Sequence, residues 1–137
     1  MNKYVISMAV MLTTISPLAQ AEEINCDKAM TTYQINMCSR QEVQQAENEM
    51  LDYLNASKDR YSEEAQVLKL LTESQAQWRE YRKAHCDAIY QVWAEGTIRG
   101  VMYNDCMFDV TKDRTHELWQ SYLTYMDSTP PILPEPE

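Results

Sequence analysis

The stretch AQWREYRKAHC, residues 76–86, places a tryptophan, two arginines and a cysteine within three turns of a predicted helix. It belongs to a longer series of residues spaced three or four positions apart, the period at which one face of a helix packs against a neighbour. That series is Val67, Leu70, Leu71, Ser74, Trp78, Tyr81, His85, Ala88 and Val92. The stretch therefore predicts a long amphipathic helix that carries full positive charges close to its packed face.

Proline and glycine are scarce on both sides of this stretch. After Pro17 the next proline is Pro130, and the only two glycines, Gly96 and Gly100, bracket the segment EGTIRG. Such spacing favours long helices with one prominent connection, and no alternating strand pattern competes with it. The sequence predicts an all-α fold, a small antiparallel three-helix bundle with a short N-terminal segment.

Capping signals give the approximate ends of the three helices. A threonine at position 31 or 32, with Gln34 able to reach back, predicts the start of the first helix, which we expect to end near residues 55–59. Ser62 followed by two glutamates predicts the start of the second. The third is expected from about Val101 to Met126.

The two ends of the chain differ in composition from the middle. A basic residue, an apolar run and small residues at Ala19 and Ala21 indicate a secretory signal peptide, which is too short for a membrane span. The tail contains four prolines and cannot continue a helix, so we expect it to be flexible and acidic. The predicted organisation is a signal peptide at 1–21, a helical domain at 22–126 and a tail at 127–137.

Charge narrows the classes of partner. The formal net charge is −9, and loss of Lys3 with the leader would make it −10. Nucleic acid is excluded as a partner on this balance, whereas a cationic protein is allowed. We expect a periplasmic or secreted protein without membrane insertion after cleavage, although acidity alone also serves solubility.

Four cysteines in a small exported domain indicate two disulfides, and four cysteines permit three connectivities. With a turn centred near residue 96, Cys86 and Cys106 lie side by side, which leaves Cys26 to pair with Cys38. The chain contains no CxxC pair and only two histidines, so we expect neither a metal site nor a cofactor.

The same register suggests how the arginines are accommodated. Trp78 falls opposite Arg114, which predicts an indole stacked under a guanidinium. A half-buried Arg82 needs a carboxylate, because an unpaired buried charge is too costly, and Glu42 and Glu47 are the nearest candidates. We interpret these residues as a structural lock rather than a ligand site: Gln75, Trp78, Arg82, Arg114, Glu42 and Glu47.

Asp105, Asp109 and Asp113 recur every four residues on the third predicted helix, and we call them the acidic ladder. Like charges at this spacing repel, so something should compensate them. One hypothesis is a docking stripe for basic side chains of a partner. The other is a solvated face relieved by Lys112, Arg114 or a neighbouring helix.

The connection between the second and third helices offers another candidate surface. Thr97, Ile98 and Arg99 lie between the glycines and could insert into a partner's cleft. Catalysis is not indicated, because the carboxylates show no recognisable pairing and neither histidine has an evident nucleophile partner. We therefore do not expect an enzyme.

The order of several residues resembles the lysozyme inhibitor LprI-like N-terminal domain family between Cys26 and Leu118. The resemblance is carried by Cys26, Cys38, Gln75, Trp78, Tyr81, Arg82, Cys86, Cys106, Thr111, Arg114 and Leu118. It implies a small exported helical domain that binds and inhibits a lysozyme-like hydrolase. Two alternatives stay open: an immunity protein against a toxin delivered by a competing bacterium, and a structural or chaperone-like envelope protein.

Overall fold

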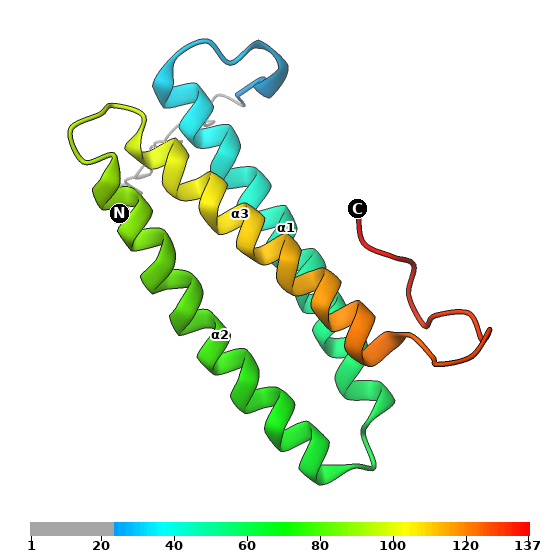
Figure 1. Ribbon diagram of the computed structural model, residues 1–137. Helices are drawn as coiled ribbons and strands as arrows, with labels where there is room; N and C mark the ends of the chain where they lie inside the picture. Colours follow the sequence, from blue (N-terminus) through cyan, green and yellow to red (C-terminus); the bar gives the residue numbers. More distant parts are fainter. Residues whose placement is uncertain (1–23) are drawn as a thin grey trace, which may run out of the picture.

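A computed structural model describes residues 24–137, so the predicted signal peptide lies outside the described residues. Three long helices dominate the structure (Figure 1): α1 (Thr32–Arg60), α2 (Ala65–Val92) and α3 (Arg99–Leu118). Two shorter turns accompany them: the 3-10 turn η1 (Cys26–Lys28) and the π-helical turn η2 (Trp119–Leu123). Residues 24–137 contain no strand, and the predicted all-α class is confirmed.

The predicted helix ends agree with the structure at α1 but not at α2 or α3. At α1 the Thr31 hydroxyl accepts a hydrogen bond from the Gln34 amide, and the Gln34 side chain accepts one from the Thr31 amide, as predicted. At α2 the prediction is wrong: Glu64, not Ser62, occupies the N-cap position, and no side chain caps it. α3 is followed directly by η2, which ends at Leu123, before the predicted limit.

α3 lies between the other two helices, parallel to α1 and antiparallel to α2 (Figure 1). It packs closely against both, whereas the backbones of α1 and α2 scarcely approach each other. The largest apolar core lies toward the α1–α2 turn and joins all three helices with η2. Its buried members are Met50, Tyr53, Leu54, Leu71, Leu118 and Leu123.

Two disulfides close the fold, with the predicted connectivity. Cys86 and Cys106 join α2 to α3 with Cα atoms 5.6 Å apart, which confirms the hairpin register. Cys26 and Cys38 join η1 to α1 with Cα atoms 5.7 Å apart. Each bridge stabilises the fold by about 3 kcal/mol in the chain-entropy model.

The tail, expected from its composition to be flexible, lies against the bundle. The Tyr53 hydroxyl donates to the Pro134 carbonyl at 2.7 Å, and the Trp119 indole donates to the Leu133 carbonyl at 3.0 Å. The Ile132 amide also donates to the Leu123 carbonyl at 2.9 Å. Leu133 packs on the core. Proline lacks a backbone N–H, but the carbonyl oxygens of this proline-rich segment remain able to accept hydrogen bonds.

α2 buries a narrower stripe than its periodicity predicts. Leu71, Gln75 and Cys86 are buried, but Tyr81 is 58 % exposed and Val92 75 % exposed. The reason is that the α2 backbone lies close to α3 alone and reaches α1 only through long side chains, so its flank stays open. Within residues 24–137, none of the helices combines the length and apolarity that a membrane span requires.

Candidate functional site

Arg82 is the residue at which the three helices meet. Its Nη2 donates to Glu47 Oε1 of α1 at 2.6 Å, and its Nη1 donates to Thr111 Oγ1 of α3 at 2.7 Å. The guanidinium also lies 4.8 Å from the centre of the Trp78 ring. Because the side chain is only 12 % exposed, both the carboxylate and the indole face replace water around the charge.

The predicted stacking of Arg114 on Trp78 is wrong. Arg82 takes that position because it lies one turn beyond Trp78 on the same helix. Arg114 instead donates to Gln75 Oε1 at 3.1 Å, to Ser74 Oγ at 3.2 Å and to Glu117 Oε2 at 2.8 Å. Both guanidinium groups therefore donate to acceptors of the protein itself.

Two amide side chains also form hydrogen bonds between helices. Gln75 on α2 donates from Nε2 to Met50 Sδ on α1 at 3.3 Å, and its Oε1 accepts a hydrogen bond from Arg114 on α3. It therefore links all three helices. Asn104 Nδ2 donates to Asn36 Oδ1 at 2.8 Å and to Ser39 Oγ at 2.9 Å. Sequence reasoning missed Asn104, although it falls on the same buried face as Thr111.

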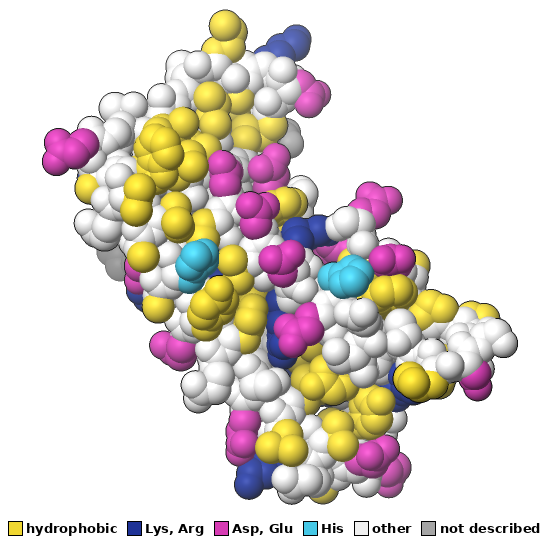
Figure 2. Space-filling model, in the orientation of Figure 1, with side chains coloured by type: hydrophobic (Ala, Val, Ile, Leu, Met, Phe, Trp, Pro, Cys, Tyr) yellow, Lys and Arg dark blue, Asp and Glu magenta, His cyan; other side chains and the backbone are white. Residues whose placement is uncertain are grey.

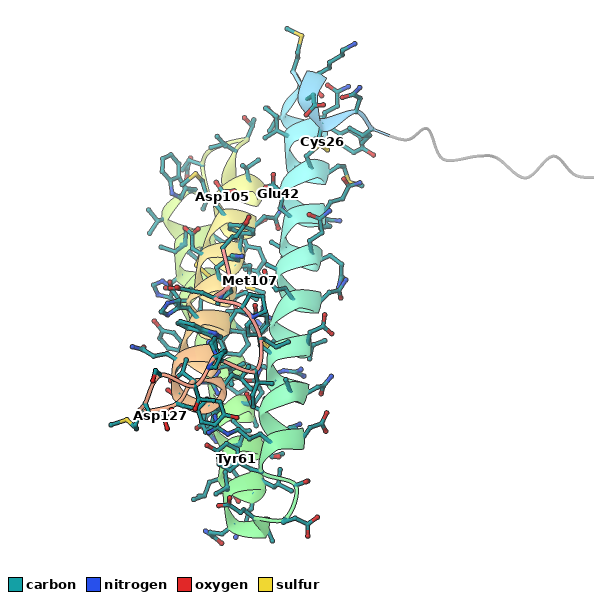
Figure 3. All side chains as sticks on the ribbon, turned by 90° about the vertical axis from the view of Figure 1, so that its right-hand side faces the viewer. Cys26, Glu42, Tyr61, Asp105, Met107 and Asp127 are labelled. Carbon is teal, nitrogen blue, oxygen red and sulfur yellow. A yellow bond between two sulfur atoms is a disulfide. The ribbon has the colours of Figure 1, made fainter. Side chains whose placement is uncertain are left out.

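Of the two carboxylates considered for Arg82, only Glu47 reaches it. Glu42 is exposed and makes no hydrogen bond or ion pair within the described part of the chain. In Figure 3, Glu42 on α1 and Asp105 on α3 lie level with each other. Glu42 thus faces solvent and does not reach the interior.

The acidic ladder lies on the outer face of α3, where all three of its carboxylates are exposed. Figure 2 shows acidic side chains gathered along this helix. Glu117 continues the same four-residue spacing toward the end of α3. The pKa of Asp105 is raised, first by its partial burial and then by the negative charge of Asp109.

The two cations considered as compensation for the ladder are engaged elsewhere. Lys112 Nζ lies 2.8 Å from Glu49 Oε2 on α1, and Arg114 pairs with Glu117. Among residues 24–137, no ion pair involves Asp105, Asp109 or Asp113. The ladder therefore presents three uncompensated carboxylates to solvent.

The connection between α2 and α3 forms an apolar tip. Val92, Trp93 and Ile98 are exposed there, as is Thr97. Arg99 folds back: its Nη1 donates to the Ala94 carbonyl at 3.2 Å, and its guanidinium lies 5.2 Å from the Tyr90 ring centre. The sequence pattern names Thr97, Ile98 and Arg99 as a surface but places Val92 on the packed face of its helix, and the structure leaves Val92 exposed.

Gly100 fixes how closely this end of α3 approaches α1. A Cβ atom added there would lie 2.9 Å from Asn36 Nδ2, nearer than such atoms normally approach. A residue with a Cβ atom at position 100 would therefore have to displace the Asn36 side chain; the φ of Gly100 is not positive, so backbone conformation does not require glycine there. In the described range, 24–137, no group of three or more His, Cys, Asp or Glu side chains is arranged to hold a metal ion.

Comparison with known proteins gives one match. A family model described as "Lysozyme inhibitor LprI" matches residues 25–118, which include all three helices and both disulfides. No curated protein and no solved structure matches the chain.

Proposed function

Because the chain belongs to the lysozyme inhibitor LprI family, we propose that it is a periplasmic binding protein that inhibits a lysozyme-like cell-wall hydrolase. The family is one of inhibitors rather than enzymes. Two disulfides, together with this family, favour a location outside the cytoplasm, where such bonds persist. The proposal concerns binding by surface contact and requires no chemical step.

The uncompensated acidic ladder is the observation that supports this function best. Three exposed carboxylates on one rigid helix, without internal cations, suit a partner whose surface carries lysine and arginine side chains. Complementary charge accelerates encounter and disfavours wrong partners. The raised pKa of Asp105 supports this, because part of its cause is a repulsion that a bound cation would relieve.

The apolar tip would provide binding energy from buried apolar side chains, which charge attraction alone does not supply. Exposed aromatic and aliphatic side chains commonly dominate the energy of protein interfaces once they enter a pocket. Trp93 and Ile98 stand at the end of the bundle and are free to enter a hydrolase cleft. In this proposal the ladder orients the inhibitor and the tip occupies the cleft.

The first test measures hydrolysis of labelled cell wall by chicken-type, goose-type and invertebrate-type lysozymes. Each enzyme is assayed with and without the oxidised mature protein, at low and at physiological salt. We expect inhibition of one lysozyme class that persists at physiological salt. Absence of inhibition, or inhibition only at low salt, would refute the proposal.

A second test asks whether the ladder is the surface used. The variant Asp105→Lys/Asp109→Lys/Asp113→Lys should raise the inhibition constant at least tenfold. The matched control changes as many exposed carboxylates on the α1 side of the molecule: Asp52→Lys/Asp59→Lys/Glu63→Lys. Equal weakening by the two triple variants would show a dependence on net charge alone and reject docking through the ladder.

A further inference from the structure

A continuous groove runs between α1 and α2, because these helices pack against α3 rather than against each other. It has three adjoining stretches with volumes of about 450, 410 and 310 Å³. The first two share Glu47, Tyr103 and Met107, and the last two share Leu51 and Arg79. In Figure 3, Met107 lies between α3 and α1.

The lining of the groove mixes apolar and polar side chains along its length, and most of its charged side chains are basic. Its aliphatic side chains recur at helical spacing on α1: Val43, Met50, Leu51 and Leu54. Five cations line it: Arg40, Lys58, Arg79, Arg82 and Lys83. Only two carboxylates do so, Glu47 and Glu80. This excess of cations contrasts with a chain whose formal net charge is −9.

Three of these cations have no charged partner in the described part of the chain. Arg82 is neutralised by Glu47 and Lys83 by Asp87. Within residues 24–137, Arg40, Lys58 and Arg79 make no ion pair. Arg40 and Lys58 lie at the two ends of the α1 side of the groove. Arg79 lies on its α2 side.

We propose that this groove docks an acidic amphipathic helix of a partner protein. Arg40 and Lys58 are eighteen residues apart on α1, about 27 Å at the rise of an α-helix, so a helix of about 20 residues would span them. Such a helix would complete a four-helix bundle, with its apolar stripe over Leu51 and Met107 and its carboxylates beside the cations. The inference does not depend on lysozyme inhibition.

The probe is an acetylated 20-residue peptide with leucines at helical spacing and flanking glutamates. A second peptide replaces every glutamate by lysine. Isothermal titration calorimetry with the oxidised mature protein should show binding of the acidic peptide and at least tenfold weaker binding of the basic one. Failure of the acidic peptide to bind, or equal affinity for both peptides, would overturn the proposal.

Two variants locate the interaction. Arg40→Glu/Arg79→Glu should weaken binding of the acidic peptide at least tenfold. Lys28→Glu/Lys69→Glu makes the same change in net charge at exposed sites outside the groove and should leave affinity within twofold. A loss as large in this control would overturn the proposal.

NMR amide shifts provide a readout that does not depend on charge substitutions. On addition of the acidic peptide, the largest shifts should fall on Val43, Leu51 and Tyr103. Shifts confined to the acidic ladder would contradict the proposal, as would binding of anionic phospholipid vesicles in place of the peptide. None of these calorimetry and NMR experiments measures hydrolase inhibition, so their outcome is independent of the proposed function.

Discussion

Arg82 and Arg114 are neutralised in different ways. The Arg82 side chain is 12 % exposed and depends on Glu47, which is itself 30 % exposed. Arg114 is held by the neutral Gln75 and Ser74 and by the exposed Glu117. Loss of Glu47 would leave the buried charge of Arg82 with only the Thr111 hydroxyl and the Trp78 ring, and a buried charge without its counter-ion is strongly destabilising.

We therefore predict that Glu47→Gln lowers the free energy of unfolding by about 1.5–3 kcal/mol, the range for hydrogen bonds to charged groups. Glu42→Gln is the matched control on the same helix and should change the free energy of unfolding by less than about 0.5 kcal/mol, since Glu42 is exposed and has no hydrogen-bond or ion-pair partner among residues 24–137. Urea denaturation measures both. Equal effects would mean that the Arg82–Glu47 pair contributes nothing specific.

Asp105 gives a prediction about pH. Its pKa is raised in the folded state, so its ionised form is less favourable there than in the unfolded chain. The ionised carboxylate therefore lowers stability above its folded-state pKa, and that cost disappears as the pH falls through this value. Asp105→Asn should raise the melting temperature at pH 7 and lose this advantage near pH 3. A gain that increases toward acid pH would contradict the assigned direction.

At the scale of the elements, sequence reasoning succeeded where the determinants are local or covalent. The Thr31 cap and the α2–α3 register are of this kind, since a capping box and a short hairpin involve nearby residues. The exposed face of α2 could not be predicted, because periodicity gives a direction but not the number of neighbouring helices. The tail's position depends on backbone carbonyls, which leave no sequence signature.

The same distinction applies to the candidate site. The spacing of Asp105, Asp109 and Asp113 is visible in the sequence. Whether Lys112 compensates them is not visible, because its partner Glu49 lies 63 residues away along the chain. The sequence gives two candidate carboxylates for Arg82, Glu42 and Glu47, but it does not distinguish between them. The reason is that α1 and α2 contact each other through long side chains, so the sequence does not fix their relative register.

The tail contributes to stability through Leu133, which packs on the core. Leu133→Ala should lower the free energy of unfolding by about 1–2 kcal/mol, less than for a fully buried leucine because the side chain is half-buried. Ile132→Ala is the control, since Ile132 is exposed and its hydrogen bond uses the backbone. Chemical denaturation measures both variants. Equal free energies of unfolding for the two would show that the tail does not pack on the core.

At the scale of the whole molecule, α3 organises the protein. It carries the acidic ladder on its outer face, supplies Tyr103 and Met107 to the groove, and connects two helices whose backbones scarcely approach each other. The attachment of α2 is the weaker of the two, because few of its residues are buried. The Cys86–Cys106 bridge therefore matters most for keeping α2 in place.

Cys86→Ser/Cys106→Ser should lower the free energy of unfolding by about 3 kcal/mol. Amide hydrogen exchange should accelerate most in α2 near residue 86, because that end loses its covalent link to α3. Cys26→Ser/Cys38→Ser should instead accelerate exchange at the start of α1. A uniform acceleration in both variants would show that neither bridge holds a particular element.

The central position of α3 also determines the order in which the chain can fold. α1 leaves the ribosome first, yet the residues that cover its apolar stripe follow much later; Asn104, which contacts Asn36, comes 68 residues after it. The α2–α3 hairpin closes over a short connection, so it can assemble early, whereas docking of α1 must wait for a distant segment. The apolar stripe of α1 is thus uncovered until α3 packs on it, and an uncovered apolar stripe is prone to aggregate.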